Sequence, residues 1–363
     1  EMRGARRGRR ERCRVCVHAL LRVLLAAAIC APLAVSGAER AASEANARSA
    51  DADAMQLGRR SEVQVFRVAV VMCAWGRLEL TRLVVAHYVS LNRAGEERGS
   101  GTIEVVPFVA VSENGVEEAL RPLVDAGSVA IVLHENRPLG RKHNALLAAV
   151  RDSRQSFDAV VVVGSDDLLN FEYFKLLRVA FVDQRAHIVG VRDLHVLELR
   201  DLNFVHTAGY RYAGNSIAAT MGLGRAYSRA LLSALNWKLW EDALESRLDR
   251  SAAMRVLDSA PLIARTSTVL FAGAAVGVVA IDVKTSLLSD AGGNNIWSFE
   301  QLIAATKLPD ARLSVFRQLE DPRAVIEKAY GNTVWDELLE LRRKMLQNAK
   351  SVERGECGEH SEL

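Results

Sequence analysis

The chain has 363 residues, of which half are hydrophobic and a quarter are charged, proportions that are ordinary for a soluble globular protein. The formal net charge is +3, and much of the positive excess lies in the first fourteen residues, so a general nucleic-acid-binding surface is not indicated. Five cysteines, three of them within the first thirty residues, exclude a disulfide scaffold.

A basic segment followed by an apolar one opens the chain. Residues 1–14 are rich in arginine, residues 15–35 are mostly apolar, and the small residues Ser36-Gly37-Ala38 follow. This order predicts a secretory signal over residues 1–38, and therefore a location in the ER or Golgi lumen or outside the cell. One alternative is a single membrane anchor with Arg22 at the interface, and another is a transit peptide for a different organelle.

Residues 39–62 carry no sustained apolar face and are expected to form a disordered linker or stem. From residue 63 onward, apolar runs alternate with segments of helical periodicity. Strands are expected over residues 65–74, 103–111, 129–133 and 159–163, and helices over residues 78–91, 116–126, 142–150 and 171–183. This alternation predicts an α/β fold with a mostly parallel sheet flanked by helices.

The later part of the body follows a different order. Residues 188–199 have the character of extended structure, residues 225–240 are expected to be helical, and C-terminal helices are expected after residue 321. Polar residues follow each strand predicted for the first part of the body. Because ligands of parallel sheets bind at the carboxyl ends of the strands, these polar residues predict a site there.

Two adjacent acidic residues, Asp166 and Asp167, follow the most regular of these strands and a Gly164-Ser165 step. A pair of carboxylates at a strand end is a good ligand set for Mg²⁺ or Mn²⁺. Such an ion would neutralise charge on a leaving diphosphate. The alternative is that an aspartate before a helix acts only as its N-cap.

These segments resemble those of the inverting, family-2-like glycosyltransferases of the GT-A fold, over about residues 66–255. Val68–Arg77 looks like the opening segment of that family, Glu135–Asn144 like its N-x-G…R-N segment, and Val160–Asp167 like the strand that carries its D-x-D motif. The resemblance implies a GT-A domain over residues 63–310, with a nucleotide-sugar half over about 63–184 and an acceptor half over about 185–310. Helices and a tail would follow over residues 311–363.

The resemblance also implies roles for single residues. It places the metal, Mn²⁺ or Mg²⁺, on Asp166 and less directly on Asp167. The first aspartate of the family's motif is replaced by Gly164, which leaves the ribose contact of that residue open. The residues implied in binding the nucleotide sugar are Trp75, Arg77, Ser112, Glu113, Asn136, Lys142, Asn144 and Ser165.

An inverting transfer needs a carboxylate that deprotonates the acceptor hydroxyl. Asp242 is favoured for this role, because Glu241-Asp242-Ala243-Leu244 resembles the family's E-D-x-x-L segment, and Asp249 is the other candidate. Either could instead be a solvated acid on a surface helix. Further along, Asp282 and Lys284 end an apolar run and could line the acceptor side. Lys284 could also reach the diphosphate, or simply lie on the surface.

The sequence therefore predicts a metal-dependent, inverting glycosyltransferase that moves a sugar from a nucleotide diphosphate to a hydroxyl of a glycan, lipid or protein acceptor. Two alternatives stay open. A sugar-phosphate nucleotidyltransferase commonly has a glycine-rich loop after its first strand, where this chain has only Trp75-Gly76-Arg77. A non-catalytic carbohydrate- or partner-binding protein with the same fold is the other alternative, and Gly164 in the metal motif keeps it open.

Overall fold

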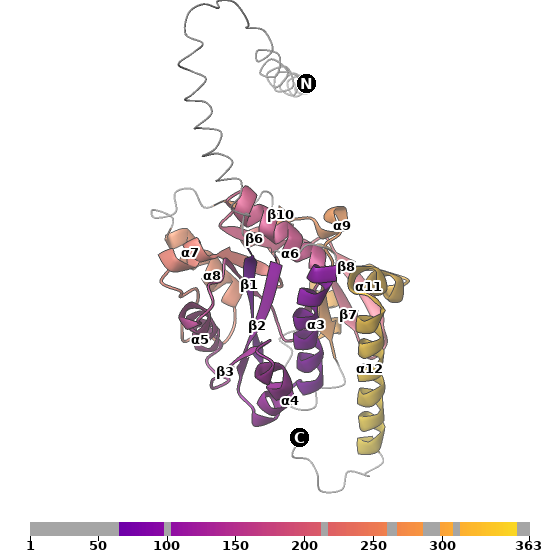
Figure 1. Cartoon of the computed structure of the whole chain (residues 1–363). Helices are drawn as coiled ribbons and strands as arrows, with labels where there is room; N and C mark the ends of the chain where they lie inside the picture. The colour runs from indigo at the N-terminus through magenta and orange to yellow at the C-terminus, as the bar shows by residue number, and fades with distance from the viewer. Residues whose placement is uncertain are drawn as a thin grey trace, which may run out of the picture. The chain divides into compact units, whose positions relative to one another are not determined.

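The computed structural model describes residues 65–97, 103–211, 217–259, 267–285, 298–307 and 313–353. These residues belong to one compact unit, Val63–Leu363 (Figure 1). The predicted signal segment and the predicted linker lie outside the described residues. Within the described ranges, no helix combines the length and the apolar character that are needed to cross a membrane.

Seven of the described strands form the central sheet, and six of these run parallel. In spatial order they are β10 (Thr268–Phe271), β6 (Ile188–Val191), β9 (Arg225–Ser228), β4 (Ala159–Val162), β1 (Phe66–Ala74), β2 (Ile103–Val111) and β3 (Ala130–Leu133). Strand β9 is antiparallel to both of its neighbours, β4 and β6. The predicted α/β class with a mostly parallel sheet is therefore confirmed, together with the four strands expected in the first part of the body.

The side chains of β1 alternate between the two faces of the sheet. Val68, Val70 and Met72 belong to the hydrophobic core beneath α3 (Leu78–Glu97), α4 (Asn114–Asp125) and α6 (Phe171–Arg178). Ala69 and Val71 belong to the core beneath α5 (Leu139–Asp152), α7 (Arg229–Ala234) and α8 (Leu248–Asp258). Because all five side chains are fully buried, a strand that is apolar at every position is what this place in the fold requires.

The helix predicted over residues 225–240 is wrong at both of its ends. Residues 225–228 form β9, and the helix covers only the six residues of α7. Ala226 and Tyr227 are buried between β4 and β6, so pairing within the sheet decides the conformation of this segment. Asn236 and Trp237 then adopt φ angles of 53° and 55°, which are incompatible with a continuing helix.

A second sheet has the spatial order β12 (Arg317–Gln318), β8 (Asn203–Thr207), β7 (Leu194–Glu198), β11 (Ala280–Lys284) and β5 (Asp167–Leu169). Strand β5 follows β4 after a short loop, so the chain passes directly from the central sheet into the second one. Strands β5 and β11 are antiparallel, and Asp167 lies opposite Asp282 in their register. This pairing brings together two acidic residues that are far apart in the sequence.

Strand β5 lies at the edge of the second sheet, and two side chains of α3 bind its outer carbonyl groups. The Tyr88 hydroxyl donates to the carbonyl oxygen of Asp167 at 3.0 Å. His87 Nε2 lies 2.8 Å from the carbonyl oxygen of Leu169 and therefore carries the hydrogen of this bond. Both side chains are buried, so they supply the donors that a neighbouring strand would otherwise offer.

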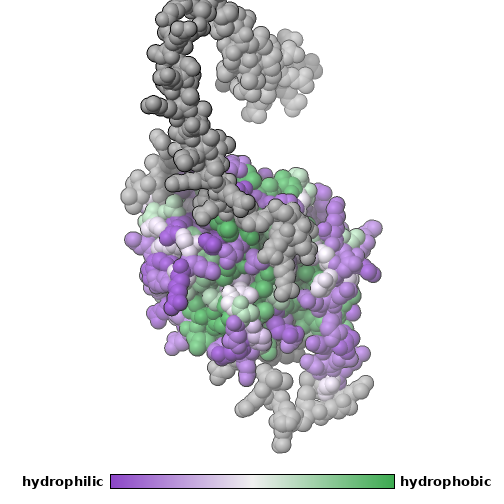
Figure 2. Space-filling model, in the orientation of Figure 1, coloured by the Kyte–Doolittle hydropathy of each residue, from purple (hydrophilic) through white to green (hydrophobic). Residues whose placement is uncertain are grey.

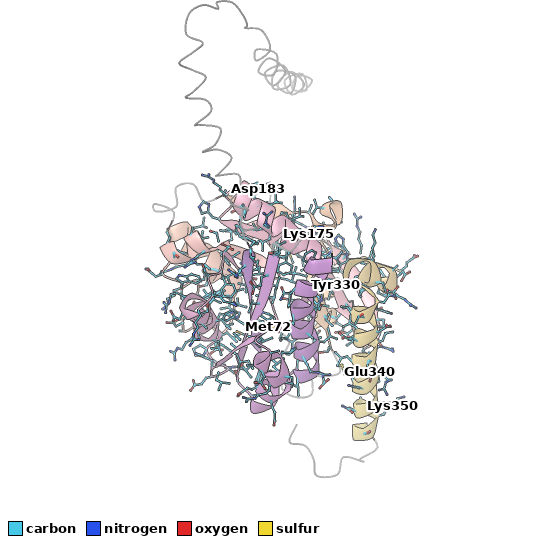
Figure 3. All side chains as sticks on the ribbon, viewed as in Figure 1. Met72, Lys175, Asp183, Tyr330, Glu340 and Lys350 are labelled. Carbon is cyan, nitrogen blue, oxygen red and sulfur yellow. The ribbon has the colours of Figure 1, made fainter. Side chains whose placement is uncertain are left out.

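The C-terminal helices pack against the same strand. Tyr330, the last residue of α11 (Pro322–Tyr330), donates to the carbonyl oxygens of Leu168 at 3.0 Å and of Val279 at 2.7 Å (Figure 3). The predicted C-terminal helices are confirmed, since α12 (Asn332–Glu353) follows directly. Its buried apolar residues are Val334, Trp335, Leu338, Leu341 and Met345.

Figure 1 places α12 along the right-hand side of the view, and Figure 2 shows mostly hydrophilic residues there. The helix therefore turns one apolar side to the core and a polar side outward. The remaining described elements are short: a π-helical turn after α6 (Val179–Asp183), a 3-10 turn (Ile217–Ala219), α9 (Gly273–Val276) and α10 (Phe299–Thr306).

The buried His87 makes the stability of the fold depend on pH. Burial lowers the pKa of His87 from 6.5 to about 4, although its bond to the Leu169 carbonyl favours the charged form. Between these pH values His87 is protonated in the unfolded chain but neutral in the folded chain. The contribution of His87 to the free energy of unfolding is therefore complete above pH 6.5 and is lost as the pH falls toward 4. The free energy of unfolding of the wild type should therefore fall between pH 7 and pH 5. In His87→Gln, which lacks the histidine, we expect this fall to be smaller by roughly 2 kcal/mol. Urea denaturation at both pH values measures this, and an unchanged loss would contradict it.

Candidate active site

The polar residues predicted to form a site follow strands whose carboxyl ends share one edge of the central sheet. Trp75, Ser112 and Asn136 follow β1, β2 and β3, which are parallel neighbours. The amide of Gly76 donates to the Glu113 carboxylate at 2.9 Å, which joins the first two loops. This edge is where ligands of parallel sheets bind.

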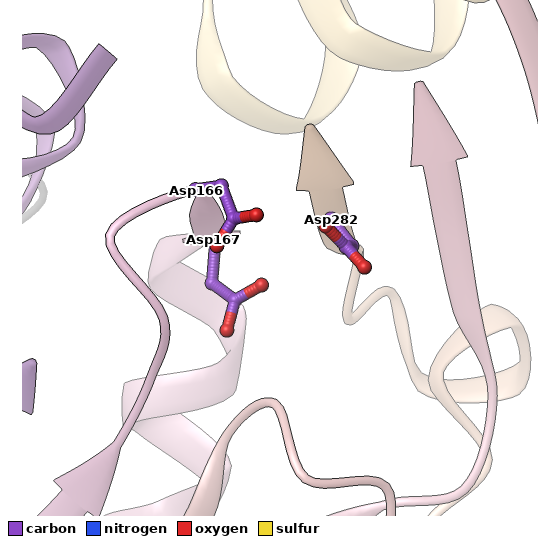
Figure 4. A group of neighbouring side chains, drawn as sticks. All are labelled: Asp166, Asp167 and Asp282. Carbon is purple, nitrogen blue, oxygen red and sulfur yellow. The ribbon is translucent and has the colours of Figure 1, made fainter. Parts of the chain in front are cut away.

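Three aspartates form an acidic cluster at this edge. Asp166 comes from the β4–β5 connection, Asp167 from the start of β5 and Asp282 from β11, and one carboxylate oxygen of each lies within 4.8 Å of the others (Figure 4). Asp166 and Asp167 are buried, and the Asp282 side chain is 19% exposed. Helix α6 begins later, with Asn170 at its N-cap position, so the interpretation of the acidic pair as a helix cap is wrong.

Two basic side chains contact the acidic cluster. Arg77, in the turn after β1, places Nη1 at 2.5 Å from the Asp166 carboxylate and donates from Nη2 to the Ser165 hydroxyl at 3.1 Å. Lys284 Nζ lies 2.7 Å from Asp282 and 3.6 Å from Asp166. Because Lys284 is only 9% exposed, its interpretation as a surface lysine is wrong.

The two cations do not balance the three carboxyl groups. Burial raises the pKa of Asp166, but the charges of Arg77 and Lys284 outweigh it and hold that pKa below its usual range. Burial and the neighbouring carboxylates Asp166 and Asp282 raise the pKa of Asp167 well above its usual value. Burial likewise raises the pKa of Asp282, despite the adjacent Lys284. A further cation at this place would let all three carboxyl groups ionise.

The donor set fits a hard divalent ion. Each aspartate offers a carboxylate oxygen, the ligand type that Mg²⁺ and Mn²⁺ prefer. Two of the three ligands sit opposite each other on paired strands, so the backbone fixes their separation. The residues that could hold a metal are therefore Asp166, Asp167 and Asp282.

Gly164 allows the acidic cluster to be compact. Its amide donates to the Asp167 carboxylate at 2.5 Å. A Cβ atom at this position would lie 2.6 Å from Asp166 Oδ1 and 3.0 Å from Asp167 Oδ2, and would displace both carboxylates. A larger side chain at this position would require the carboxylates of Asp166 and Asp167 to shift, and Asp282 brings a third carboxylate to the cluster from another strand.

Lys142 lies beneath the loops that follow the first three strands. Its ammonium group donates to the Ala74 carbonyl at 2.8 Å, to the Ser112 hydroxyl at 2.7 Å and to the Asn136 side-chain oxygen at 3.1 Å. The side chain is fully buried, and burial lowers its pKa. Lys142 therefore holds Ser112 and Asn136 in place, and its predicted contact with the nucleotide sugar stays a prediction.

Except for Asn144, the remaining residues predicted to bind the sugar donor lie either at the acidic cluster or in the loops above Lys142. Arg77 and Ser165 belong to the acidic cluster, where they bond to each other. Ser165 is buried, whereas Trp75 and Glu113 are half-buried in the loops. The structure thus brings most of the predicted residues to one edge of the sheet, but in separate groups.

Asn144 connects α5 to the loop that carries the first candidate base. Its side-chain amide donates to the Asp242 carboxylate and to the Trp240 carbonyl, both at 2.8 Å. Lys238 Nζ lies 2.7 Å from the other oxygen of Asp242. The hydrogen bonds from Lys238 and Asn144 lower the pKa of Asp242, so this half-exposed group is ionised at neutral pH.

Asp249, the second candidate base, lies in the first turn of α8 and pairs with Arg225 Nη1 at 3.1 Å. The Arg225 side chain is almost completely buried, while the Asp249 side chain is 58% exposed. Arg225 begins β9 opposite Val162, the last residue of β4, so this pair also lies near the carboxyl edge. Asp249 here balances the charge of a buried arginine.

The sequence did not point to Asp282 as a metal ligand or to Lys284 as its partner. The sequence analysis assigns both to the acceptor side, because they end an apolar run in the later part of the body. The available signal was the alternation of apolar and charged residues in Ile281-Asp282-Val283-Lys284, which puts both charges on one face of a strand. The strand that pairs with β5 is known only from the fold.

The fold and the site together define an α/β protein with a parallel central sheet and a buried acidic cluster at its carboxyl edge. No family model matches the sequence, and no curated protein matches it. Residues 1–349 of S. aureus TarS are similar in structure, with 12% identity, coverage of 80% of this chain and 92% of that chain, and a TM-score of 0.40. The same TarS segment in complex with UDP-GlcNAc gives a TM-score of 0.44 at the same identity and coverage.

The longer TarS chain is covered to 55%, at 12% identity and a TM-score of 0.39. The 4-diphosphocytidyl-2C-methyl-D-erythritol synthase of Anaerococcus prevotii is also similar, with 9% identity, coverage of 57% of this chain and 88% of that chain, and a TM-score of 0.34. The likeness is one of fold only, and the function is inferred from the residues of the site.

The role of Lys142 can be tested by Lys142→Met. Removing the ammonium group leaves the oxygens of Ala74, Ser112 and Asn136 without their common donor, so we expect a loss of at least about 2 kcal/mol in unfolding free energy. Lys175→Met, which removes a half-exposed lysine paired with Glu172, is the matched control and should cost less than about 1 kcal/mol. Chemical denaturation measures both. A Lys142→Met protein of wild-type stability that fails to bind nucleotide would make Lys142 a ligand contact instead.

Proposed function

We propose that the chain is a glycosyltransferase that moves a sugar from a nucleotide diphosphate donor to an acceptor hydroxyl, with inversion at the transferred carbon and with a divalent metal ion. The observation that carries this proposal is the convergence of Asp166, Asp167 and Asp282 at the carboxyl edge of the sheet, with Arg77 and Lys284 beside them. A diphosphate that leaves as an anion needs positive charge around it, which a divalent ion on the three carboxylates would supply together with Arg77 and Lys284.

The acidic cluster and its two cations act together on the diphosphate. A Mg²⁺ or Mn²⁺ ion on the three carboxylates would neutralise negative charge on the leaving diphosphate. Arg77 is held by both Asp166 and Ser165, so its guanidinium offers a fixed positive charge. Lys284 carries its charge on a flexible stem and can turn toward a phosphate group.

The nucleoside is assigned to the loops after β2 and β3. Ser112, Glu113 and Asn136 are only partly buried and offer hydroxyl, carboxylate and amide groups. Such groups recognise ribose hydroxyls and base edges by hydrogen bonding. Lys142 donates hydrogen bonds to Ser112 and Asn136, and the Gly76 amide donates one to Glu113, so all three side chains are held in place.

Asp242 is the preferred catalytic base. Its carboxylate is half-exposed, ionised, and held in orientation by Asn144 and Lys238, as a group that must accept a proton from an acceptor hydroxyl requires. Asp249 has a different role, because removing its charge would leave the buried Arg225 without its acidic partner.

The proposals for the acceptor segment and the cellular location rest on the sequence alone. The segment over about residues 185–310 would bind a glycan, lipid or protein that offers the hydroxyl. The basic and apolar start of the chain supports a reaction in the ER or Golgi lumen or outside the cell, with an uncleaved N-terminal anchor or another organelle as the alternatives.

The proposal predicts binding of a nucleotide that depends on a metal ion. The thermal stability of the full chain should be measured with a panel of nucleoside diphosphates and nucleotide sugars, with Mn²⁺ or with EDTA. One nucleotide class at 100 times its dissociation constant should stabilise the protein by about 2.7 kcal/mol in Mn²⁺ and much less in EDTA. Asp282→Asn should remove this difference, and Asp183→Asn, a substitution of an exposed acid, should keep it.

Stabilisation by a nucleoside triphosphate with release of pyrophosphate would move the function to a nucleotidyltransferase. No stabilisation by any nucleotide, from well-folded protein, would leave a non-catalytic binding protein as the better description.

The two candidate bases should behave differently when each is neutralised. We expect Asp242→Asn to lower kcat/KM for sugar transfer by at least about 100-fold, because the acceptor loses its proton acceptor. The affinity for the nucleotide should change by less than about twofold. Asp249→Asn should instead reduce the unfolding free energy and affect transfer less, because it leaves the buried Arg225 without its acidic partner. The opposite pattern in these two variants would assign the base to Asp249.

A further inference from the structure

Lys284 holds the position that a bound cation would take against Asp282 and Asp166. Its ammonium nitrogen lies 2.7 Å from Asp282 and 3.6 Å from Asp166, two of the three carboxylates that could hold a metal. It follows Asp282 by two positions on β11, so both side chains project from the same face of the strand. The shorter of the two distances shows that Asp282 is the closer partner of the ammonium group.

Arg77 and Lys284 differ in how firmly they are held. Arg77 contacts Asp166 with one nitrogen and Ser165 with another, so its fork is fixed by two partners. Lys284 is a point charge at the end of a four-carbon stem, and its ion-pair partners are two metal-ligand candidates. Of the two cations, Lys284 is therefore the one that can leave without breaking a bidentate arrangement.

A divalent ion on the acidic cluster would lie against the same two aspartates, Asp282 and Asp166, that the ammonium group contacts. With Lys284 in place, an incoming ion meets carboxylates that are already partly neutralised, and it meets the repulsion of a positive charge a few ångströms away. Asp167, the third carboxylate, accepts a hydrogen bond from the Gly164 amide and is therefore held by the backbone. It can receive a metal where it stands, while Asp282 must first give up the lysine; the Asp166 oxygen that Lys284 approaches at 3.6 Å is also bound by Arg77 at 2.5 Å.

We propose that Lys284 is an internal competitor of the divalent ion, which occupies the acidic cluster in the metal-free protein and has to be displaced for the metal to bind. This rests on the metal site of the proposed function. The lysine then has a regulatory role, because the resting site stays closed to free divalent ions at low concentration. It also keeps the buried carboxylates partnered while no metal is present.

The test is a titration of the full chain with Mn²⁺ alone, in the absence of any nucleotide, followed by calorimetry or by the electron paramagnetic resonance of free Mn²⁺. We expect Lys284→Met to bind Mn²⁺ at least about tenfold more tightly than the wild type. Lys284→Arg keeps the positive charge and should stay within about threefold of the wild type. Lys175→Met, which removes a lysine from an exposed ion pair on α6, should leave the affinity unchanged.

Adding Asp282→Asn to Lys284→Met should abolish the increase in Mn²⁺ affinity. This result would show that the ion binds at the acidic cluster. If Lys284→Met does not fold, Lys284→Gln, which keeps a polar end without the charge, takes its place, and circular dichroism establishes folding before each titration. An affinity in the neutral variant equal to or weaker than that of the wild type overturns the proposal. So does the absence of Mn²⁺ binding in both proteins.

Because the readout is metal binding, it does not depend on sugar transfer. A failure of the transferase proposal appears as the absence of nucleotide binding or turnover, while a failure of the competition appears as an unchanged Mn²⁺ affinity.

Discussion

The antiparallel pairing of β5 with β11 is the interaction on which the rest of the site depends. It places Asp167 directly opposite Asp282, and it carries Asp166 and Lys284 into the same cluster. Strand β5 is only three residues long and lies at a sheet edge, so pairing alone would hold it weakly. Hydrogen bonds from His87, Tyr88 and Tyr330 to three successive carbonyl groups of β5 add to the pairing and hold the strand in place.

These bonds also explain why the C-terminal helices belong to the site. Tyr330 reaches β5 from α11, and its ring packs edge-on against His87 with 5.3 Å between the ring centroids. Strand β5 is thus fixed by a helix from the beginning of the domain and a helix from its end. The carboxylates can be buried because the backbone that carries them cannot relax toward solvent, and because Arg77 and Lys284 offset part of their charge.

The sequence predicted those parts of the fold that are decided locally. The strand at 66–74 and the strand at 103–111 are apolar at nearly every position, which any place in a doubly covered sheet requires, so their structure does not depend on a particular partner. Residues 225–228 are different. They have a helical pattern but form a strand, because Ala226 and Tyr227 pair with both β4 and β6. The local sequence does not indicate this pairing.

The same distinction applies to the site. Asp166 and Asp167 could be predicted because they follow a strand in the sequence, and the strand itself aims them at the carboxyl edge. Asp282 and Lys284 could not, because their place is set by which strand pairs with β5, a choice made between segments that are remote in the chain. Gly164 has a local reason, since a Cβ atom there would meet the carboxylates of Asp166 and Asp167, which follow it closely in the chain.

Helix α5 couples the two sides of the candidate reaction. Lys142 and Asn144 are two positions apart, so they leave the helix in nearly opposite directions. Lys142 reaches the loops after β1, β2 and β3, while Asn144 reaches the loop that carries Asp242. At Gly140 the same loop comes so close that a Cβ atom would overlap the Glu241 carbonyl, and the Gly140 amide donates to the Leu244 carbonyl at 2.8 Å. One helix therefore sets the distance between the nucleoside side and the preferred base, which makes that distance a property of the scaffold rather than of the loops.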